Sequence, residues 1–262
     1  MKHTPFELAV AGQSLQGYMY APDRPKAVVI LVHGMGEYGQ RNERFIIPNL
    51  VENGLAVLTY DQFGHGRNKG KKGHHPGYVY LLECIDRCLD KSKEEWVSLP
   101  ILLYGHSMGC NVVLNYLLTR PDQLAGAVVT SPFLRLAFNP PGWKLSLGKI
   151  LAKLIPSVTL PNELDASAIS QISEEVEAYE NDPMIHNLVS PAYSIEFMSE
   201  GEKILSRASE ISTPMLLLHG NADRITDSAA SRELAKEASD KVKFIEIEGG
   251  YHELHHDLEK EQ

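Results

Sequence analysis

The feature that most constrains this chain is a short glycine-bounded turn between an apolar run and a helix-like stretch. Residues 100–104 are apolar and predict a buried strand, and residues 111–118 predict a helix. Between them, Gly105-His106-Ser107-Met108-Gly109 must reverse the chain within a few residues. Glycine has no Cβ to clash in so tight a turn, so we expect Ser107 to be held in a strained conformation with its hydroxyl exposed. A strand, a Gly-x-Ser-x-Gly turn and a helix in this order are typical of a nucleophile elbow.

Short runs rich in Val, Ile and Leu alternate with helical periodicity along the chain. Continuous apolar runs, rather than strict alternation, indicate strands covered on both faces and hence a mostly parallel sheet. Regular β-α alternation then predicts a doubly wound α/β domain, with a central sheet flanked by helices. The expected strands are 28–32, 55–60, 101–104, 127–130, 215–218 and 242–247, and the expected helices are 44–52, 79–90 and 228–238.

One stretch interrupts this alternation. Residues 132–207 contain helical pieces punctuated by proline and no clear strand. An insertion at this point would lie over the carboxyl ends of the strands, where open α/β sheets bind ligands. We therefore predict a core formed by residues 1–131 and 208–262, with a helical cap at 132–207. The cap contains one apolar stripe, which predicts packing on the cap's own core with lipid contact as the alternative: Trp143, Leu147, Ile150, Leu151 and Leu154.

A serine nucleophile needs a base, and the base needs a carboxylate to orient it. Asp223 follows the predicted strand 215–218, and His252 follows the predicted strand 242–247. Because the carboxyl ends of parallel strands meet at one edge of a sheet, we expect both side chains to lie near Ser107. The order serine, acid, histidine is that of α/β-hydrolase triads. The sequence therefore predicts Ser107, Asp223 and His252 as the catalytic residues.

The negative charge that develops during acyl transfer needs two backbone N–H donors. One is expected from Met108, directly after the nucleophile, and the other from Met35 in the loop 33–36. In this interpretation His33 and Gly34 only shape that loop.

Composition excludes several classes of function. The formal net charge of −9 argues against nucleic acid as a partner and against strong attraction to anionic membranes. The apolar runs are too short to span a bilayer, and nothing near Met1 resembles a signal peptide, so a cytoplasmic location is expected. The three cysteines fit a reducing compartment. Cys84 and Cys88 are interpreted as core positions of a helix, and Cys110 as packing beneath the elbow.

Metal binding is the rival interpretation, because the chain contains 11 histidines. The adjacent pairs 74–75 and 255–256 should point apart on regular elements and so should not chelate together. Cys84 and Cys88 have helical spacing that could hold zinc, but no second pair of suitable spacing accompanies them. We therefore predict no metal site and no cofactor.

The chain resembles α/β-hydrolases of the monoacylglycerol lipase and lysophospholipase group over about residues 6 to 256. The stretches that carry the resemblance are 33–37, 61–67, 105–109, 221–224 and 251–254 in the core, and 160–167 and 179–183 in the cap. The core motifs are common to many hydrolases, whereas the cap stretches are more particular.

The resemblance implies a triad that cleaves the ester of glycerol and a fatty acid through an acyl-enzyme. It also implies a pocket beneath the cap, apolar for the acyl chain and polar at the glycerol end. Residues that match the polar end are Glu37, Arg41, Tyr179 and His255, for which solvated loop charges and a structural tyrosine are the alternatives.

Other functions stay open from the sequence. A lysophospholipase, a thioesterase or a broad-specificity carboxylesterase would use the same triad. A non-catalytic hydrolase-like binding protein is a more distant alternative. The substrate is expected to be a small lipid ester, with transient contact between the cap and a membrane or micelle surface, and the oligomeric state is left open.

The chain ends ten residues after His252, where similar hydrolases usually continue through a closing helix. We therefore expect that helix to be truncated or missing and the loop around His252 to be less rigid. The charged tail 257–262 is expected to be solvated surface.

Overall fold

The structure is a computed structural model that describes residues 3–120, 124–238 and 240–258. Within these residues one eight-stranded sheet has the strand order β1-β2-β4-β3-β5-β6-β9-β10. β1 pairs antiparallel with β2, and β2 with β4, whereas the remaining neighbours are parallel. The strands are β1 (Thr4–Val10), β2 (Gln13–Tyr20), β3 (Ala27–Val32), β4 (Leu55–Tyr60), β5 (Ile101–His106), β6 (Gly126–Thr130), β9 (Met215–Gly220) and β10 (Val242–Ile247).

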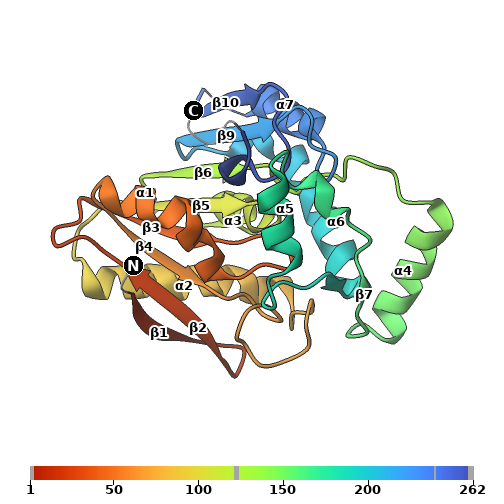
Figure 1. The fold of residues 1–262 in the computed structure, drawn as a ribbon, viewed down its shortest axis with the longest axis horizontal. Helices are drawn as coiled ribbons and strands as arrows, with labels where there is room; N and C mark the ends of the chain where they lie inside the picture. Colours follow the sequence, from red (N-terminus) through yellow and green to blue (C-terminus); the bar gives the residue numbers. More distant parts are fainter. Residues whose placement is uncertain (1–2, 121–123, 239, 259–262) are drawn as a thin grey trace.

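Helices cover both faces of the sheet. On β3, Ile30 belongs to the hydrophobic cluster that includes side chains of α2 (Tyr78–Glu95) and α3 (Met108–Thr119). The next residue, Leu31, belongs to a second cluster that contains α1 (Ile46–Glu52). Successive side chains of a strand point to opposite faces, so these helices lie on opposite sides of the sheet, as Figure 1 shows. The predicted α/β fold, mostly parallel and flanked by helices, is confirmed.

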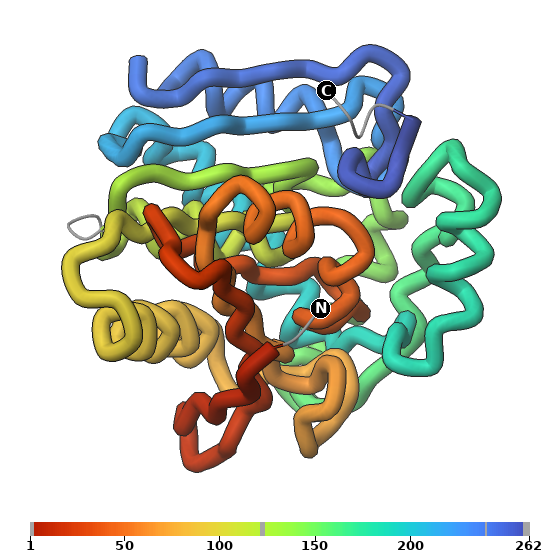
Figure 2. The backbone as a smooth tube through the Cα atoms, turned by 60° about the vertical axis from the view of Figure 1, so that its left-hand side comes forward, coloured from red at the N-terminus to blue at the C-terminus, as the bar shows by residue number. Residues whose placement is uncertain are grey.

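The chain between β6 and β9 contains α4 (Gly142–Leu154), α5 (Ser173–Glu180) and α6 (Pro191–Ser206). It also contains the 3-10 turns η2 (Ala166–Ala168) and η3 (Ala208–Glu210), and a two-residue pair, β7 (Leu160–Pro161) with β8 (Leu188–Val189). This small antiparallel pair was not expected, because two residues are too few to leave a pattern in the sequence. In Figure 2 the segment that carries α5 stands beside the strand ends, next to the last described residues in dark blue.

The apolar stripe of α4 does not pack on a core. Trp143 is 65% exposed, Ile150 53% and Leu154 74%, and α4 has no buried residue. The prediction that this stripe covers a core of the cap is therefore wrong. In Figure 1 α4 lies apart from the sheet, and α6 is the element it contacts most. α6 itself contributes Tyr193 and Phe197 to the main core.

The prediction that the tail 257–262 is solvated surface is wrong at its first residue. Asp257 is fully buried and accepts hydrogen bonds from the backbone N–H groups of Gln171 and Tyr251, at 2.8 and 2.7 Å. It thereby connects the loop after β10 (Val242–Ile247) to the segment before α5. Leu258 is exposed, and residues 259–262 lie outside the described part of the chain.

None of the described helices is both long enough and apolar enough to cross a membrane. The buried positions of Cys84, Cys88 and Cys110 confirm their interpretation as core residues.

Candidate active site

Ser107 occupies the turn between β5 and α3. Its φ of 52° and ψ of −117° lie in a region that residues other than glycine rarely adopt, which confirms the expected strain. A Cβ on Gly109 would lie 2.1 Å from the carbonyl oxygen of Val32, so only glycine fits there. The turn is fixed from the next strand because the N–H of Ser107 donates to the carbonyl of Thr130 at 3.0 Å.

The structure brings the predicted serine, histidine and aspartate into one hydrogen-bonded chain. Ser107 Oγ lies 2.9 Å from His252 Nε2, and His252 Nδ1 lies 2.7 Å from Asp223 Oδ2. A carboxylate only accepts hydrogen bonds, so Nδ1 carries the proton and Nε2 is left to accept from the serine hydroxyl. The three residues come from loops after β5, β9 and β10.

Asp223 is held by several donors besides His252. Its Oδ1 accepts from the N–H groups of Ile225 and Thr226, at 2.7 and 3.0 Å. Its Oδ2 accepts from the hydroxyl of Thr226 at 2.8 Å. Burial alone would raise the pKa of this carboxyl, but the charge of His252 and the hydrogen bonds outweigh burial and hold the pKa well below its usual value.

One further donor to Asp223 was not predicted from the sequence. His219 is fully buried, and its Nε2 lies 3.1 Å from Asp223 Oδ2 while its Nδ1 lies 2.7 Å from the hydroxyl of Ser231 on α7 (Ser228–Glu237). The only sequence signal is a histidine at the carboxyl end of the strand that precedes the acid.

The environment of His252 favours its protonated form. Burial lowers the pKa of His252, but the adjacent Asp223 carboxylate has the larger combined effect and leaves the pKa raised above the usual value. Glu253 and Glu37 act in the same direction.

The two predicted donors to a developing oxyanion are residues that lie close to Ser107, Met108 in the chain and Met35 across the cavities. Met108 is the first residue of α3, so its N–H is one of those without an acceptor inside the helix. Met35 lines both cavities that reach Ser107. The loop that carries Met35 is fixed by His33, whose Nε2 accepts from the N–H of Gln62 at 3.0 Å. Gln62 also donates from its side chain to the carbonyl of His33 at 2.7 Å, which is consistent with a loop-shaping role for His33.

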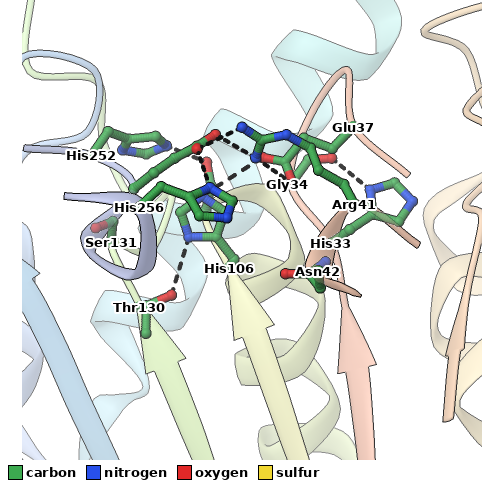
Figure 3. A network of polar contacts seen from close by, with 12 residues as sticks. His33, Gly34, Glu37, Arg41, Asn42, His106, Thr130, Ser131, His252 and His256 are labelled. Atoms are coloured by element: carbon green, nitrogen blue, oxygen red, sulfur yellow. Dashed lines mark hydrogen bonds and ion pairs between the residues drawn. The ribbon is translucent and has the colours of Figure 1, made fainter. Parts of the chain in front are cut away.

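A buried network of polar side chains lies above the strand ends, beside His252 (Figure 3). Arg41 donates two hydrogen bonds to the carboxylate of Glu253, at 2.9 and 2.8 Å, and both side chains are almost fully buried. The Arg41 guanidinium also lies 5.1 Å from the ring centroid of Tyr179 on α5. Arg41 therefore connects the loop after β3, the loop that carries His252 and the segment between β6 and β9.

Glu37 stands in the same network without a short ion pair. Its carboxylate oxygens lie 3.8 Å from Arg41 and 3.8 Å from Nε2 of His106. Burial is the largest influence on Glu37 and raises its pKa to about 7. Burial also lowers the pKa of His106 to about 3, so His106 is neutral at physiological pH.

Two cavities of different character meet at Ser107. The larger, called the polar cavity below, has a volume of about 560 Å³ and a mixed lining, in which Glu37, Tyr179 and His252 stand among apolar side chains. The smaller has a volume of about 120 Å³ and is almost wholly apolar, with Met108, Phe133, Leu136, Phe138 and Met198 among its lining. Leu136, Phe138 and Met198 also line a third, mostly apolar hollow of about 360 Å³ against α4.

Of the four residues predicted at the polar end of the pocket, two line the polar cavity and two do not. Glu37 and Tyr179 line the polar cavity, whereas Arg41 and His255 lie behind it. His255 is buried, with its ring centroid 4.7 Å from that of His106.

Two groups of side chains have spacing that could hold a metal ion: Glu253 with His255 and His256, and Glu253 with Glu37 and His106. The expectation that the histidine pair 255–256 points apart is wrong, because their ring centroids lie 4.5 Å from each other on a 3-10 turn. Both groups depend on Glu253, whose two oxygens already accept from Arg41. The guanidinium charge therefore opposes a cation at either place.

Residues 23–259 match the model of the family Hydrolase_4, described as serine aminopeptidase, S33. A monoacylglycerol lipase of Mycolicibacterium smegmatis is 31% identical to the chain, over 96% of this chain and 90% of that protein. An uncharacterized abhydrolase domain-containing protein of Dictyostelium discoideum is 34% identical over 91% of this chain, which spans 25% of that much longer protein.

Among solved structures, the crystal structure of a monoacylglycerol lipase from Paleococcus ferrophilus is similar with a TM-score of 0.87. It is 31% identical in sequence, and the match covers 94% of each chain.

Proposed function

The chain belongs to the Hydrolase_4 family, within the monoacylglycerol lipase group of α/β-hydrolases, and from this premise we propose that it hydrolyses monoacylglycerols to glycerol and free fatty acid. Membership of this group makes it a hydrolase of carboxylic esters. The Ser-His-Asp mechanism, the residue roles and the substrate are our proposal.

The position of Ser107 between two unlike cavities is the observation that carries the proposal. An ester of a fatty acid and glycerol has one apolar and one polar half, and its carbonyl carbon lies at their junction. The apolar cavity at Ser107 continues toward α4 and suits an acyl chain, whereas the polar cavity suits an alcohol. A substrate placed in this way puts its ester carbon at the serine hydroxyl.

In the proposed acylation step, Ser107 Oγ attacks the ester carbonyl while His252 Nε2 takes the serine proton. The N–H groups of Met35 and Met108 stabilise the oxyanion. The C–O bond to glycerol then breaks, and His252 gives its proton to the departing oxygen. Water, activated by His252, attacks the acyl-serine and releases the fatty acid, with Ser107 restored. Asp223 keeps His252 in the required tautomer throughout, and water is the one reactant besides the ester that these steps need.

We further propose that Glu37 and Tyr179 contact the glycerol hydroxyls, because both line the polar cavity. Arg41 and His255 then act from behind it, Arg41 by fixing Glu253 and the ring of Tyr179.

Residues 132–207 are proposed to act as the cap of this site. Residues from this segment line all three hollows described above, among them Leu164 and Met198. The exposed apolar side chains of α4 stand at the open end of the apolar route, so we propose that α4 contacts a lipid surface while substrate enters.

The test is fatty acid release from a monoacylglycerol and from a lysophospholipid with the same acyl chain. We expect release from the monoacylglycerol, with at least about a 10⁴-fold loss in Ser107→Ala. A fluorophosphonate should label the wild-type protein at Ser107 and leave the variant unlabelled. Labelling without cleavage of either lipid would contradict the proposed substrate, and no labelling would contradict the mechanism.

A further inference from the structure

The polar cavity beside Ser107 is lined by carboxylates and by no lysine or arginine among the described residues. The acidic side chains that line it are Glu37, Asp165, Glu180, Asp182 and Glu253. Its two histidines add no fixed positive charge, because burial lowers the pKa of His186 and His252 must be neutral to act as a base. This is the cavity that receives the alcohol half of the ester.

Two of these carboxylates have a cation nearby, and one of the two is in a direct ion pair. Glu253 is paired with Arg41, which lies directly behind the cavity. Asp165 lies within the electrostatic reach of Arg224, and its nearest contact is a hydrogen bond from the N–H of Ser167.

Of the other three carboxylates, Asp182 and Glu180 have no cation at short range among the described residues. Asp182 accepts from the neutral hydroxyl of Tyr38 at 2.8 Å and from the N–H of Met184 at 2.8 Å, and neither donor carries charge. Glu180 is exposed at the end of α5. Glu37 adds little to this charge, because burial raises its pKa to about 7 and Arg41 lies 3.8 Å away.

We infer that the alcohol cavity discriminates by charge, so that the enzyme also hydrolyses esters of cationic alcohols, such as acylcholines, and rejects esters whose alcohol carries a phosphate. This inference rests on the proposed function, because it assumes that the polar cavity receives the alcohol. It extends the substrate class beyond glycerol and separates monoacylglycerols from anionic lysophospholipids.

The physical reason is the field of uncompensated carboxylates in a cleft with low-dielectric walls. Such a cleft concentrates counterions and raises the association rate of an oppositely charged ligand, and salt weakens the effect. A quaternary ammonium has no hydrogen-bond donors, so it can exploit this field without competing for the contacts that hold Asp182. A phosphate would bring negative charge against the same carboxylates, and the described lining offers no lysine or arginine to receive it.

A matched pair of soluble esters tests the inference. Butyrylcholine and 3,3-dimethylbutyl butyrate share the acyl chain and the shape of the alcohol, and differ in the charge of one atom. We expect kcat/KM for butyrylcholine to exceed that for the neutral ester about fivefold or more at low ionic strength, and the ratio to fall toward one in 0.5 M salt. A monoacylglycerol should exceed the corresponding acylglycerol phosphate by about tenfold or more.

Charge-removing variants test whether the preference for the choline ester arises at the polar cavity. In Glu180→Gln/Asp182→Asn the choline-to-neutral ratio should fall at least about threefold, and the neutral ester measured on the same preparation corrects for any loss of folded enzyme. Glu177→Gln removes one negative charge from an exposed position of α5 that does not line the cavity, and should leave the ratio unchanged.

The outcomes separate the two proposals. A cleaved monoacylglycerol together with a ratio near one, or a ratio that neither salt nor the double variant changes, overturns the charge selection and leaves the proposed function standing. Failure to cleave the monoacylglycerol, while butyrylcholine is still preferred over its neutral analogue, overturns the proposed lipid substrate and leaves the charge selection standing.

Discussion

At the scale of single residues, the site depends on how Asp223 is held. Its two oxygens accept from His252, from Thr226, from the N–H of Ile225 and from His219. Hydrogen bonds to an ionised group are among the strongest in proteins. Each donor fixes the carboxylate and disperses its charge, which limits how far Asp223 raises the pKa of His252. His219 therefore acts as a positioning residue, with its ring oriented by Ser231.

Replacement of His219 tests this role. In His219→Leu we expect kcat to fall about 10- to 100-fold, because a buried charged acceptor loses a donor. The pH at which activity is half lost on the acid side should also rise, since Asp223 then stabilises protonated His252 more strongly. His219→Gln keeps a donor and should restore both quantities in large part. Equal behaviour of the Leu and Gln variants would mean that only side-chain volume matters.

The pH dependence of the wild-type enzyme follows from His252. His252 can act as the proposed base only when neutral, and its pKa is raised above the usual value of 6.5. Activity should therefore be present above that raised pKa and be lost as the pH falls through it. The measurement is kcat/KM for a neutral ester from pH 5 to 9. An acid limb centred below 6.5 would show that Asp223 does not dominate the environment of His252.

At the scale of elements, Arg41 and Glu253 connect segments that no hydrogen-bonded sheet joins. Arg41 lies in a 3-10 turn after β3, and Glu253 follows His252 in the loop after β10. The pair is buried on both sides and its two hydrogen bonds run in parallel. The loop that carries His252 was expected to be less rigid, and this pair together with Asp257 holds it within the described residues.

Removal of one partner of the Arg41–Glu253 pair should lower the free energy of unfolding. Glu253→Ala leaves a guanidinium buried without its carboxylate, for which the cost is about 3–5 kcal/mol of unfolding free energy. Arg41→Met/Glu253→Met removes both charges and should recover much of that loss. Urea unfolding gives the free energy of unfolding of the wild-type protein, of Glu253→Ala and of the double variant. Glu83→Gln is the control.

Glu83 is half-buried and pairs with Arg87 on the surface of α2, so its loss should cost less than about 1 kcal/mol. A Glu253 variant no less stable than the Glu83 variant would contradict a structural role for the buried pair.

At the scale of the whole molecule, charge and apolar surface are unevenly distributed. The chain has a net charge of −9, yet α4 carries Lys144, Lys149 and Lys153 and no acidic residue. The same helix exposes Trp143, Leu147, Ile150 and Leu154. A helix with basic and apolar side chains and no buried face fits the interface of a lipid surface better than open water.

Tryptophan fluorescence can test this contact. Of the two tryptophans, Trp143 is 65% exposed and Trp96 is half-buried on the core. Added vesicles should shift the emission of the wild-type protein to shorter wavelength, and Trp143→Phe should abolish the shift. Leu147→Glu/Ile150→Glu should weaken vesicle binding while hydrolysis of a soluble aryl ester is retained. An unchanged emission spectrum at saturating lipid would contradict the proposed contact.

The sequence by itself determined the features that depend on neighbouring residues or on strand order. The elbow could be predicted because a strand, two glycines and a helix leave Ser107 one way to turn. The triad could be predicted because parallel strands bring their carboxyl ends to one edge of the sheet, which places Asp223 and His252 near Ser107 without knowledge of any distance.

Only the tertiary structure decided which side chains complete the site. Arg41 and Glu253 are separated by 212 positions, so no local pattern indicates that they pair. An apolar stripe on α4 has the same period whether a core or open surface lies opposite it, and the structure places it in the open. The balance of charge in the polar cavity was equally hidden. It depends on which carboxylates face a guanidinium and which do not, and that is a property of distances between segments that fold together from distant parts of the chain.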